Sequence, residues 1–385
     1  MRTDTIRSLS RRLTVLIYFA VVLLPVALFG YDGPWVGGGN ISIRGKAPFP
    51  SKFTPGTFKD FDEWFADRVG LRYPLIYAGT ELHIGLLHRP LDRHILFGRD
   101  NWMFWTDDQE TVPATMADSR GKLRFTPPEL TRIDAQLRTS RDQFAACGIP
   151  GVIIIAPNKQ SLYGEFLINA DAGSPPTRLD TLMNALSGPA KAMIIDPRAM
   201  MRAAKLSHAP LHLYNKTESH WNALGAFYGY VAIISSLTRM TPIARHELTS
   251  LDHYRVYSRR YPGGDMAVRV LFSPWRFADD DVLVEPKLPI PGLEVIQVAH
   301  EHTLYRNPQG KGRLVLFGDS FAHAVMPFLA QHFNEVHRFT GEVFDGSIIA
   351  AYRPAAVVLL MVERYANRLL RPPIKLAQMC ESAAQ

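Results

Sequence analysis

Three uninterrupted apolar runs constrain this chain more than any other feature. They are GVIIIA at 151–156, LVLF at 314–317 and AVVLLMV at 356–362. A strand with one solvated face alternates apolar and polar residues, whereas a continuous apolar run is typical of a strand buried on both faces. Segments with helical spacing precede the first run, at 130–144, and follow it, at 223–237. This alternation predicts an α/β fold with a doubly wound, mostly parallel sheet and helices on both faces.

Weaker patterns predict the remaining elements and the domain limits. We expect helices from Phe58 and at 177–187 and 322–333, and short strands within 94–105, 192–195 and 336–340. Segment 241–313 is rich in proline and arginine and carries short β-like runs, so it is predicted to be an insertion or an antiparallel excursion. The predicted domain covers 58–370, and 371–385 is predicted to be a C-terminal tail.

The N-terminal region contains an uncharged, strongly apolar stretch at 13–30. Its eighteen residues would form a helix about 27 Å long, close to the hydrocarbon thickness of a bilayer. The alternative is a cleaved signal peptide, but ALFGYDG matches a cleavage site poorly. The basic segment 1–12 is therefore predicted to be cytoplasmic, followed by a transmembrane anchor and a Gly- and Pro-rich linker at 31–57. In a bacterium, the rest of the chain would be a periplasmic domain tethered to the inner membrane.

Charge and cysteine content exclude several classes of protein. The net charge is +7 over 385 residues, and the first twelve residues, with four arginines and one aspartate, supply three of those charges. No lysine-rich run or zinc-finger spacing occurs, so no nucleic-acid partner is expected. Cys147 and Cys380 are too few for a disulfide scaffold or a metal cluster. One bridge between them in an oxidising compartment stays open, but two free thiols are expected. No metal is predicted.

Ser320 follows one of the apolar runs, in the stretch FGDSF at 317–321. Ligand sites of open α/β sheets lie beyond the carboxyl ends of the strands, so Ser320 is a candidate nucleophile. Main-chain N–H groups near Ser320 and Phe321 would then face a developing oxyanion. The alternative is that Asp319 or Ser320 only caps the next helix.

A base and an acid for such a serine occur together in the sequence TESHWN at 217–222. Residues two apart in an extended segment point to the same side, so Glu218 and His220 can face one site. A carboxylate beside the imidazole would hold its tautomer and stabilise its charged form. The alternative is that Ser219 or Asn222 caps the following helix, and this role is compatible with catalysis.

Taken together, these motifs resemble the SGNH-hydrolase-like family of polysaccharide O-acetyltransferases, the AlgJ/AlgX-like alginate acetylation proteins. The resemblance rests on GRDNWMFW (98–105), APNKQSLY (156–163), TESHWNALGAFYGY (217–230), GGDMA (263–267) and FGDSF (317–321). Common SGNH esterases place their histidine after the serine instead. The resemblance implies an SGNH-like fold, Ser320 as nucleophile, His220 as base and Glu218 where the family usually has aspartate.

The resemblance also implies a reaction. An acetyl group would pass through a serine acyl-enzyme to hydroxyls of an exopolysaccharide, which is alginate-like, cellulose or another secreted glycan. A membrane-bound O-acyltransferase partner would supply the acetyl group, and no cofactor is implied. An acetyl esterase with the same triad, or a non-catalytic polysaccharide-binding scaffold, are the alternatives. Residues that could line the rim of the site, as oxyanion or substrate contacts, are Asn158, Lys159, Tyr163 and Arg364.

Overall fold

The protein divides into two compact units, Met1–Asp92 with Pro262–Ala278, and Arg93–Tyr261 with Asp279–Gln385. The computed structural model describes residues 2–31, 46–51, 53–90, 92, 94–106, 115–168, 176–243, 246–271, 273, 276–372 and 374–376, without the side chains of 2–10 and 246. The predicted domain 58–370 therefore begins inside the smaller unit.

The smaller unit is helical. Its elements are α1 (Arg2–Ala27), α2 (Thr57–Ala66), α3 (Arg72–Leu87) and a π-helical turn (Met266–Val270). Phe29 contacts the rings of Trp64 and Phe65, each at 5.5 Å between ring centroids, so the chain after α1 packs on α2. Within the described ranges, no helix is both long and apolar enough to cross a bilayer. The predicted anchor at 13–30 is therefore not confirmed.

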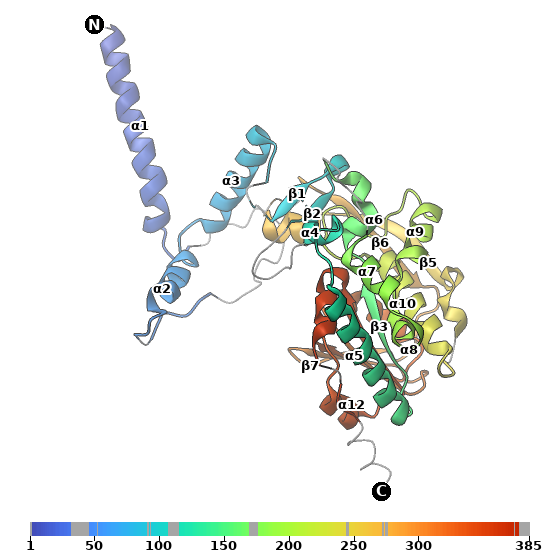
Figure 1. The fold of residues 1–385 in the computed structure, drawn as a ribbon. Coiled ribbons are helices and arrows are strands. Elements are labelled where there is room, and N and C mark those ends of the chain that lie inside the picture. Colours follow the sequence, from blue (N-terminus) through green and yellow to red (C-terminus); the bar gives the residue numbers. More distant parts are fainter. Residues whose placement is uncertain are drawn as a thin grey trace. The chain divides into compact units, whose positions relative to one another are not determined.

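The larger unit is built on a seven-stranded sheet with the order β4-β3-β11-β9-β10-β8-β7. Figure 1 labels two of these strands, β3 and β7. The strands are β3 (Gly151–Ala156), β4 (Ile194–Ile195), β7 (Glu294–Ala299), β8 (His302–Arg306), β9 (Arg313–Gly318), β10 (Glu335–Thr340) and β11 (Ala356–Val362). From β4 to β10 neighbouring strands are parallel, whereas β8 and β7 are antiparallel at one edge. The prediction of a mostly parallel sheet is confirmed.

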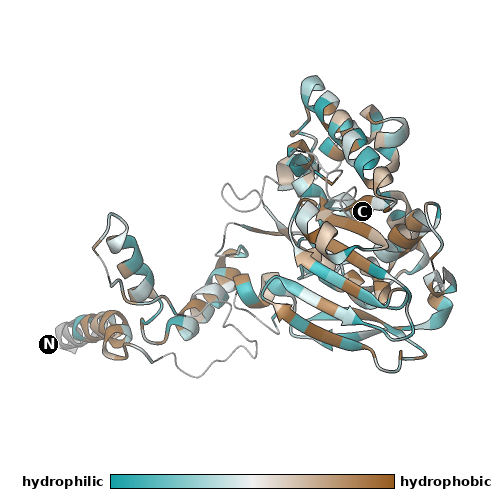
Figure 2. Cartoon of the chain, turned by 90° about the horizontal axis from the view of Figure 1, so that it is seen from below, coloured by the Kyte–Doolittle hydropathy of each residue, from teal (hydrophilic) through white to brown (hydrophobic). Residues whose placement is uncertain are grey.

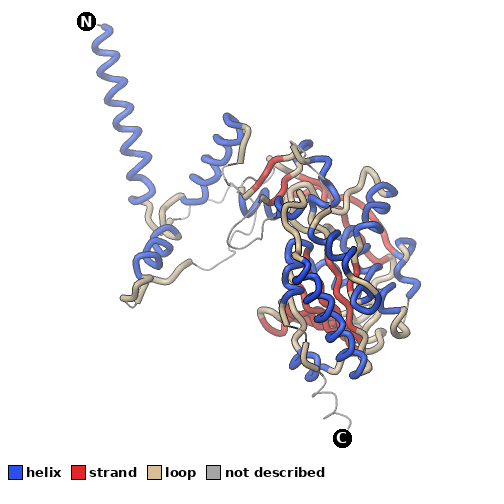
Figure 3. The backbone as a smooth tube through the Cα atoms, in the orientation of Figure 1, coloured by secondary structure: helices blue, strands red, loops and turns tan. Residues whose placement is uncertain are grey.

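Alternate residues of the central strands enter two hydrophobic cores, one on each face of the sheet. Ile154 and Leu316 belong to the first core, and Ile153 and Val315 to the second. Both faces are therefore covered by helices, drawn in blue beside the red strands in Figure 3. The central strands β3 and β11 are buried and apolar along their length. Figure 2 draws the apolar segments of the protein in brown. The first core includes α9 (Arg198–Ser207), α10 (Ala223–Thr238), the 3₁₀ helix η6 (Ser320–Val325) and α11 (Met326–Leu329), and the second α5 (Pro127–Ala146), α7 (Arg178–Ala185), α8 (Gly188–Ala192), α12 (Gly346–Tyr352) and η7 (Glu363–Leu370).

Two antiparallel hairpins complete the larger unit. They pair β1 (Ile95–Phe97) with β2 (Met103–Trp105), and β5 (Tyr254–Tyr261) with β6 (Asp279–Pro286). Short helices connect the elements: η1 (Arg99–Asn101), α4 (Thr115–Ser119), α6 (Lys159–Tyr163), η2 (Gly164–Phe166), η3 (His246–Thr249) and η4 (Leu251–His253). Segment 241–313 thus contains β5 to β8, all antiparallel to their neighbours, apart from residues 262–278, which belong to the smaller unit.

Two expectations need correction. The helix predicted at 322–333 is instead η6 followed by the single turn of α11, which ends at Leu329. Pro327 lacks the N–H that a continuous α-helix would need at this point. Cys147 is disulfide-bonded, although free thiols were expected. The C-terminal segment lies near the end of α5 that precedes Cys147, where the N–H of Leu376 donates to the Gln143 side chain. Cys380 lies outside the described residues.

Candidate active site

Several of the predicted site residues follow strands whose carboxyl ends meet at one edge of the sheet. Ser320 comes after β9, Asn158 after β3 and Arg364 after β11, and these three strands are parallel neighbours. This edge is where open α/β sheets place their ligand sites.

The turn that carries Ser320 is fixed by Asp319. One carboxylate oxygen of Asp319 accepts the N–H of Phe321 at 2.9 Å, and the other accepts the N–H of Val362 at 2.8 Å. Burial raises the pKa of Asp319. A Cβ atom at Gly318 would lie 2.9 Å from the main-chain oxygen of Leu360, so glycine permits the close approach to β11. Asp319 is therefore the helix cap, and Ser320, exposed at the first position, is left available.

The structure brings Ser320, His220 and Glu218 together. The Oγ atom of Ser320 lies 2.7 Å from Nε2 of His220, and Nδ1 of the same ring lies 2.7 Å from Oε1 of Glu218. When Nδ1 carries the proton and donates a hydrogen bond to the carboxylate, Nε2 is free to accept the serine proton. The arrangement can thus activate a hydroxyl as a nucleophile.

The segment that carries Glu218 and His220 is held from two sides. The N–H of Thr217 donates to Asp279 of β6 at 3.0 Å. From the other side, the Nζ atom of Lys159 donates to the main-chain oxygen of Glu218 at 3.1 Å. Asn222 caps α10, because its side-chain oxygen accepts the N–H groups of Leu224 and Gly225. Of the two predicted caps, Asn222 is the one used.

Phe321 contributes to the site through its ring rather than through its main-chain N–H, which is occupied by Asp319. The ring lies 5.0 Å from the His220 ring between centroids. The guanidinium of Arg364 lies 5.7 Å from the centre of the Phe321 ring. Arg364 is therefore one ring removed from the base, and its side chain is largely buried.

The other predicted rim residues turn inward. Asn158 is fully buried, and its side-chain nitrogen donates to Asp118 at 3.4 Å. Tyr163 is also fully buried, with its hydroxyl oxygen accepting the N–H of Leu213 at 2.7 Å, and burial raises its pKa. Lys159 is buried among main-chain oxygens. These three side chains are therefore buried beside the site and do not line its rim.

Two contributors had no sequence signal. Arg338, on β10, donates to the main-chain oxygens of Gly318 at 3.4 Å and Asp319 at 3.2 Å, and so supports the Ser320 turn. Burial lowers the pKa of the nearby His323, and the charges of Arg338 and His220 lower it further. Asp279 stands in a run of aspartates that resembles any solvated strand end. Only the folded chain relates these positions to the serine and the histidine.

Among the described residues of each unit, no three His, Cys, Asp or Glu side chains lie close enough together to share one ion.

Comparisons with known proteins agree with this fold. The family model of the SGNH hydrolase-like domain of the acetyltransferase AlgX matches residues 95–346. No curated protein sequence matches the chain. The solved structure of Bacillus cereus PatB1 with a sulfonyl adduct has a TM-score of 0.51 at 14% identity, covering 73% of this chain and 97% of that one. At this identity the comparison shows a shared fold alone.

Two further structures have lower TM-scores. The O-acetyltransferase domain of Pseudomonas putida AlgJ has a TM-score of 0.43 at 19% identity, covering 75% of this chain and 99% of that one. Pseudomonas aeruginosa AlgX has a TM-score of 0.44 at 16% identity, covering 75% and 67%.

Proposed function

The chain belongs to the SGNH hydrolase-like acetyltransferase family of AlgX, and from this premise we propose that it acetylates a secreted polysaccharide through an acyl-Ser320 intermediate. The observation that carries the proposal is the hydrogen-bonded chain from Ser320 through His220 to Glu218. Such a chain supplies a nucleophile, a base and an orienting carboxylate.

The first half of the reaction loads the acetyl group. Ser320 Oγ attacks the acetyl carbonyl carbon of a donor ester while His220 Nε2 takes the hydroxyl proton. The bond from the acetyl carbon to the donor oxygen then breaks, and His220 returns the proton to that oxygen. Glu218 stabilises the imidazolium that forms in between.

The second half transfers the acetyl group to the sugar. A sugar hydroxyl gives its proton to His220 and attacks the acyl carbon, after which Ser320 leaves with that proton. The N–H of Phe321 is engaged by Asp319, whereas the N–H of Ser320 donates to no acceptor in the described part of the protein. The Ser320 N–H is therefore the main-chain donor that we assign to the oxyanion.

We place the enzyme in the periplasm. The disulfide at Cys147 supports an oxidising compartment, because cytosolic thiols are kept reduced. The apolar segment 13–30 would tether the domain to the inner membrane, beside a membrane-bound O-acyltransferase that hands over the acetyl group. In this location Cys147 reacts with a maleimide only after reduction. Labelling without reductant in freshly opened cells would argue against it.

The reaction is tested with the full chain and a chromogenic acetyl ester, with and without an oligosaccharide acceptor. We expect Ser320 to gain the mass of one acetyl group and the acceptor to become acetylated. Ser320 is exposed, so some hydrolysis is also expected. Release of acetate with no acetylated sugar would identify an esterase instead. Full polymer acetylation by Ser320→Ala would favour a scaffold.

A further inference from the structure

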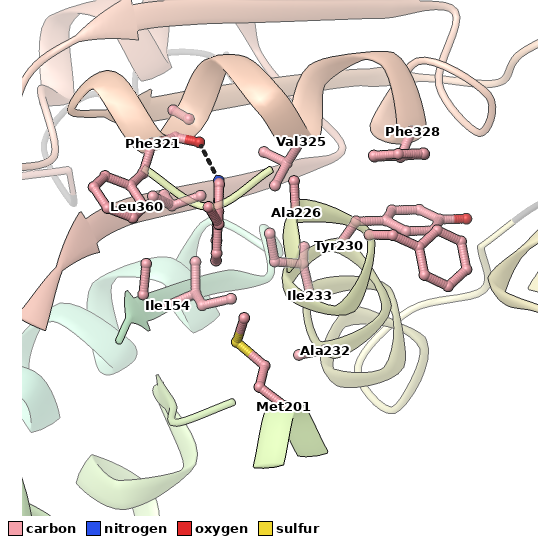
Figure 4. Close-up of a cluster of buried hydrophobic side chains, with 14 of the residues drawn as sticks. Ile154, Met201, Ala226, Tyr230, Ala232, Ile233, Phe321, Val325, Phe328 and Leu360 are labelled. Atoms are coloured by element: carbon pink, nitrogen blue, oxygen red, sulfur yellow. Dashed lines mark hydrogen bonds between the residues drawn. The ribbon is translucent and has the colours of Figure 1, made fainter. Parts of the chain in front are cut away.

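The segment that carries His220 is hydrogen-bonded to the segment that carries Ser320 at two adjacent positions. His220 Nε2 lies 2.7 Å from Ser320 Oγ, and Trp221 Nε1 donates to the main-chain oxygen of Phe321 at 3.0 Å. The second bond is the dashed line beside Phe321 in Figure 4. The segments that carry the base and the nucleophile are thus joined at two successive positions, although a hundred residues separate them in the sequence.

Trp221 is held in place by Tyr214 and by helix α10. The residue is 2% exposed, forms a β-bridge with Tyr214, and directly precedes the cap of α10. Its side chain lies against two glycines of that helix, with the ring against Gly229 and the Cβ atom against Gly225. A Cβ atom at Gly229 would lie 2.6 Å from Cη2 of the indole, and one at Gly225 would lie 2.9 Å from the tryptophan Cβ.

Glycine in a helix interior destabilises the helix relative to alanine. Glycine at two successive turns, Gly225 and Gly229, leaves room for the Trp221 side chain to pack against the helix. The packing fixes the direction of the indole N–H, and that N–H fixes the Phe321 carbonyl. The peptide on the other side of Phe321 is bound by Asp319. The residue after the nucleophile is therefore restrained at both its N–H and its carbonyl group.

We propose that Trp221 is a positioning residue, which keeps Ser320 Oγ within hydrogen-bonding reach of His220 by holding the Phe321 carbonyl. This inference rests on the proposed function, because it takes Ser320 as nucleophile and His220 as base. Because Trp221 is buried, it would act through η6, by its bond to the Phe321 carbonyl and by packing against the Phe321 ring at 5.4 Å between centroids. A displacement of about 1 Å at a reacting group can slow a reaction about 100-fold, so a single such bond affects the rate strongly.

The test compares two tryptophan-to-phenylalanine variants of the full chain. Trp221→Phe removes the donor and keeps an aromatic ring. Trp64→Phe is the control, because Trp64 lies on α2 in the smaller unit. The readout is the rate at which phenylmethylsulfonyl fluoride modifies Ser320, followed by intact-protein mass. Sulfonylation needs the nucleophile and base but neither acetyl donor nor sugar.

We expect Trp221→Phe to slow sulfonylation by about tenfold or more. The acetyl-ester kcat should fall in parallel with KM unchanged, whereas Trp64→Phe should react at the wild-type rate. Equal rates in the two variants would overturn the positioning role while leaving the proposed function intact. Absence of wild-type labelling at Ser320 would overturn the nucleophile itself, and with it both proposals.

A second variant tests the proposal even if the Trp221→Phe protein does not fold. Gly229→Ala keeps every polar group but pushes a methyl group against the indole. It should slow sulfonylation in the same direction as Trp221→Phe. Gly79→Ala in α3, where an added Cβ meets nothing within 4 Å, is its control. A folded Gly229→Ala protein that reacts at the wild-type rate would contradict the proposal.

Discussion

The Nζ atom of Lys159 lies 3.1 Å from the main-chain oxygen of Glu218, the residue whose carboxylate bonds His220. The same atom donates to the carbonyl oxygens of Met103 at 2.8 Å and Lys216 at 2.7 Å. Since the Lys159 side chain is 4% exposed, a buried cation draws three main-chain oxygens together. The ammonium group thereby fixes the backbone from which the acid of the proposed triad projects.

Replacing Lys159 by methionine should damage both stability and turnover. A buried carbonyl left without its donor costs about 1–3 kcal/mol, so we expect the free energy of unfolding to fall by at least about 2 kcal/mol. The ester kcat should fall as well, because Glu218 is no longer held. Urea unfolding and turnover by the folded protein measure the two effects. The control is Lys205→Met, since Lys205 donates to the carbonyl of Leu162 instead. An equal loss of kcat in both variants would contradict this role.

The length of the Glu218 side chain matters for the proposed triad. With the backbone held by Lys159, the glutamate side chain spans the distance to His220 and ends 2.7 Å from Nδ1. Aspartate is one methylene shorter, so Glu218→Asp should lower kcat by pulling the carboxylate back from the ring. Glu218→Gln keeps the length but removes the charge, and should lower kcat by about 10²–10⁴-fold. KM should change little in either variant.

Steady-state kinetics with an acetyl ester measure how the length and the charge of the Glu218 side chain each affect kcat. A Glu218→Asp enzyme as active as wild type would show that the backbone adapts to the shorter acid. Wild-type kcat in Glu218→Gln would remove Glu218 from the triad altogether.

Asp319 should tolerate neither loss of charge nor loss of an acceptor. Its two carboxylate oxygens accept the N–H groups of Phe321 and Val362. An asparagine has only one acceptor oxygen, so Asp319→Asn leaves one of these N–H groups facing an amide NH₂. The expected cost is about 1–3 kcal/mol of stability, together with slower acylation of Ser320. Thermal unfolding and Ser320 sulfonylation measure these effects, and wild-type behaviour in both would contradict the cap's role.

The central strands could be predicted because burial on both faces leaves a sequence without alternation. β3 and β11 coincide with two of the apolar runs, and β9 extends the third by one residue at each end. The antiparallel edge was less visible. β7 is exposed along most of its length, and its sequence EVIQVA does not indicate that it extends the main sheet. Edge strands of this kind are defined by hydrogen bonds to β8 rather than by residue type.

The site could be predicted only as far as its backbone positions. Ser320, His220 and Glu218 come together as the motifs suggested. Asn158 and Lys159 lie at the expected end of β3, but their side chains point into the protein. Residue type suggested a solvated rim, because polar and charged side chains are usually exposed. The carbonyl oxygens that accept from Lys159 come from distant segments and have no signature in the sequence.

Glu363 is a buried acid directly after β11, and its titration should influence stability. The residue is 1% exposed. One oxygen accepts the N–H of Asn158 at 2.9 Å and the hydroxyl of Ser161 at 2.6 Å. The other lies 3.6 Å from a guanidinium nitrogen of Arg198. Burial raises the pKa of Glu363 from 4.5 to about 7, although Arg198 opposes the shift.

This raised pKa predicts the sign of a pH effect. Between about pH 4.5 and 7, the folded protein retains a proton on Glu363 that the unfolded chain has released. The contribution of Glu363 to the free energy of unfolding therefore falls as pH rises through this window, and is constant above it. Glu363→Gln stays neutral and removes the decline. Urea unfolding across the window should show the variant gaining stability relative to wild type as pH rises. A difference between the two proteins that stays constant with pH would contradict a buried acid with a raised pKa.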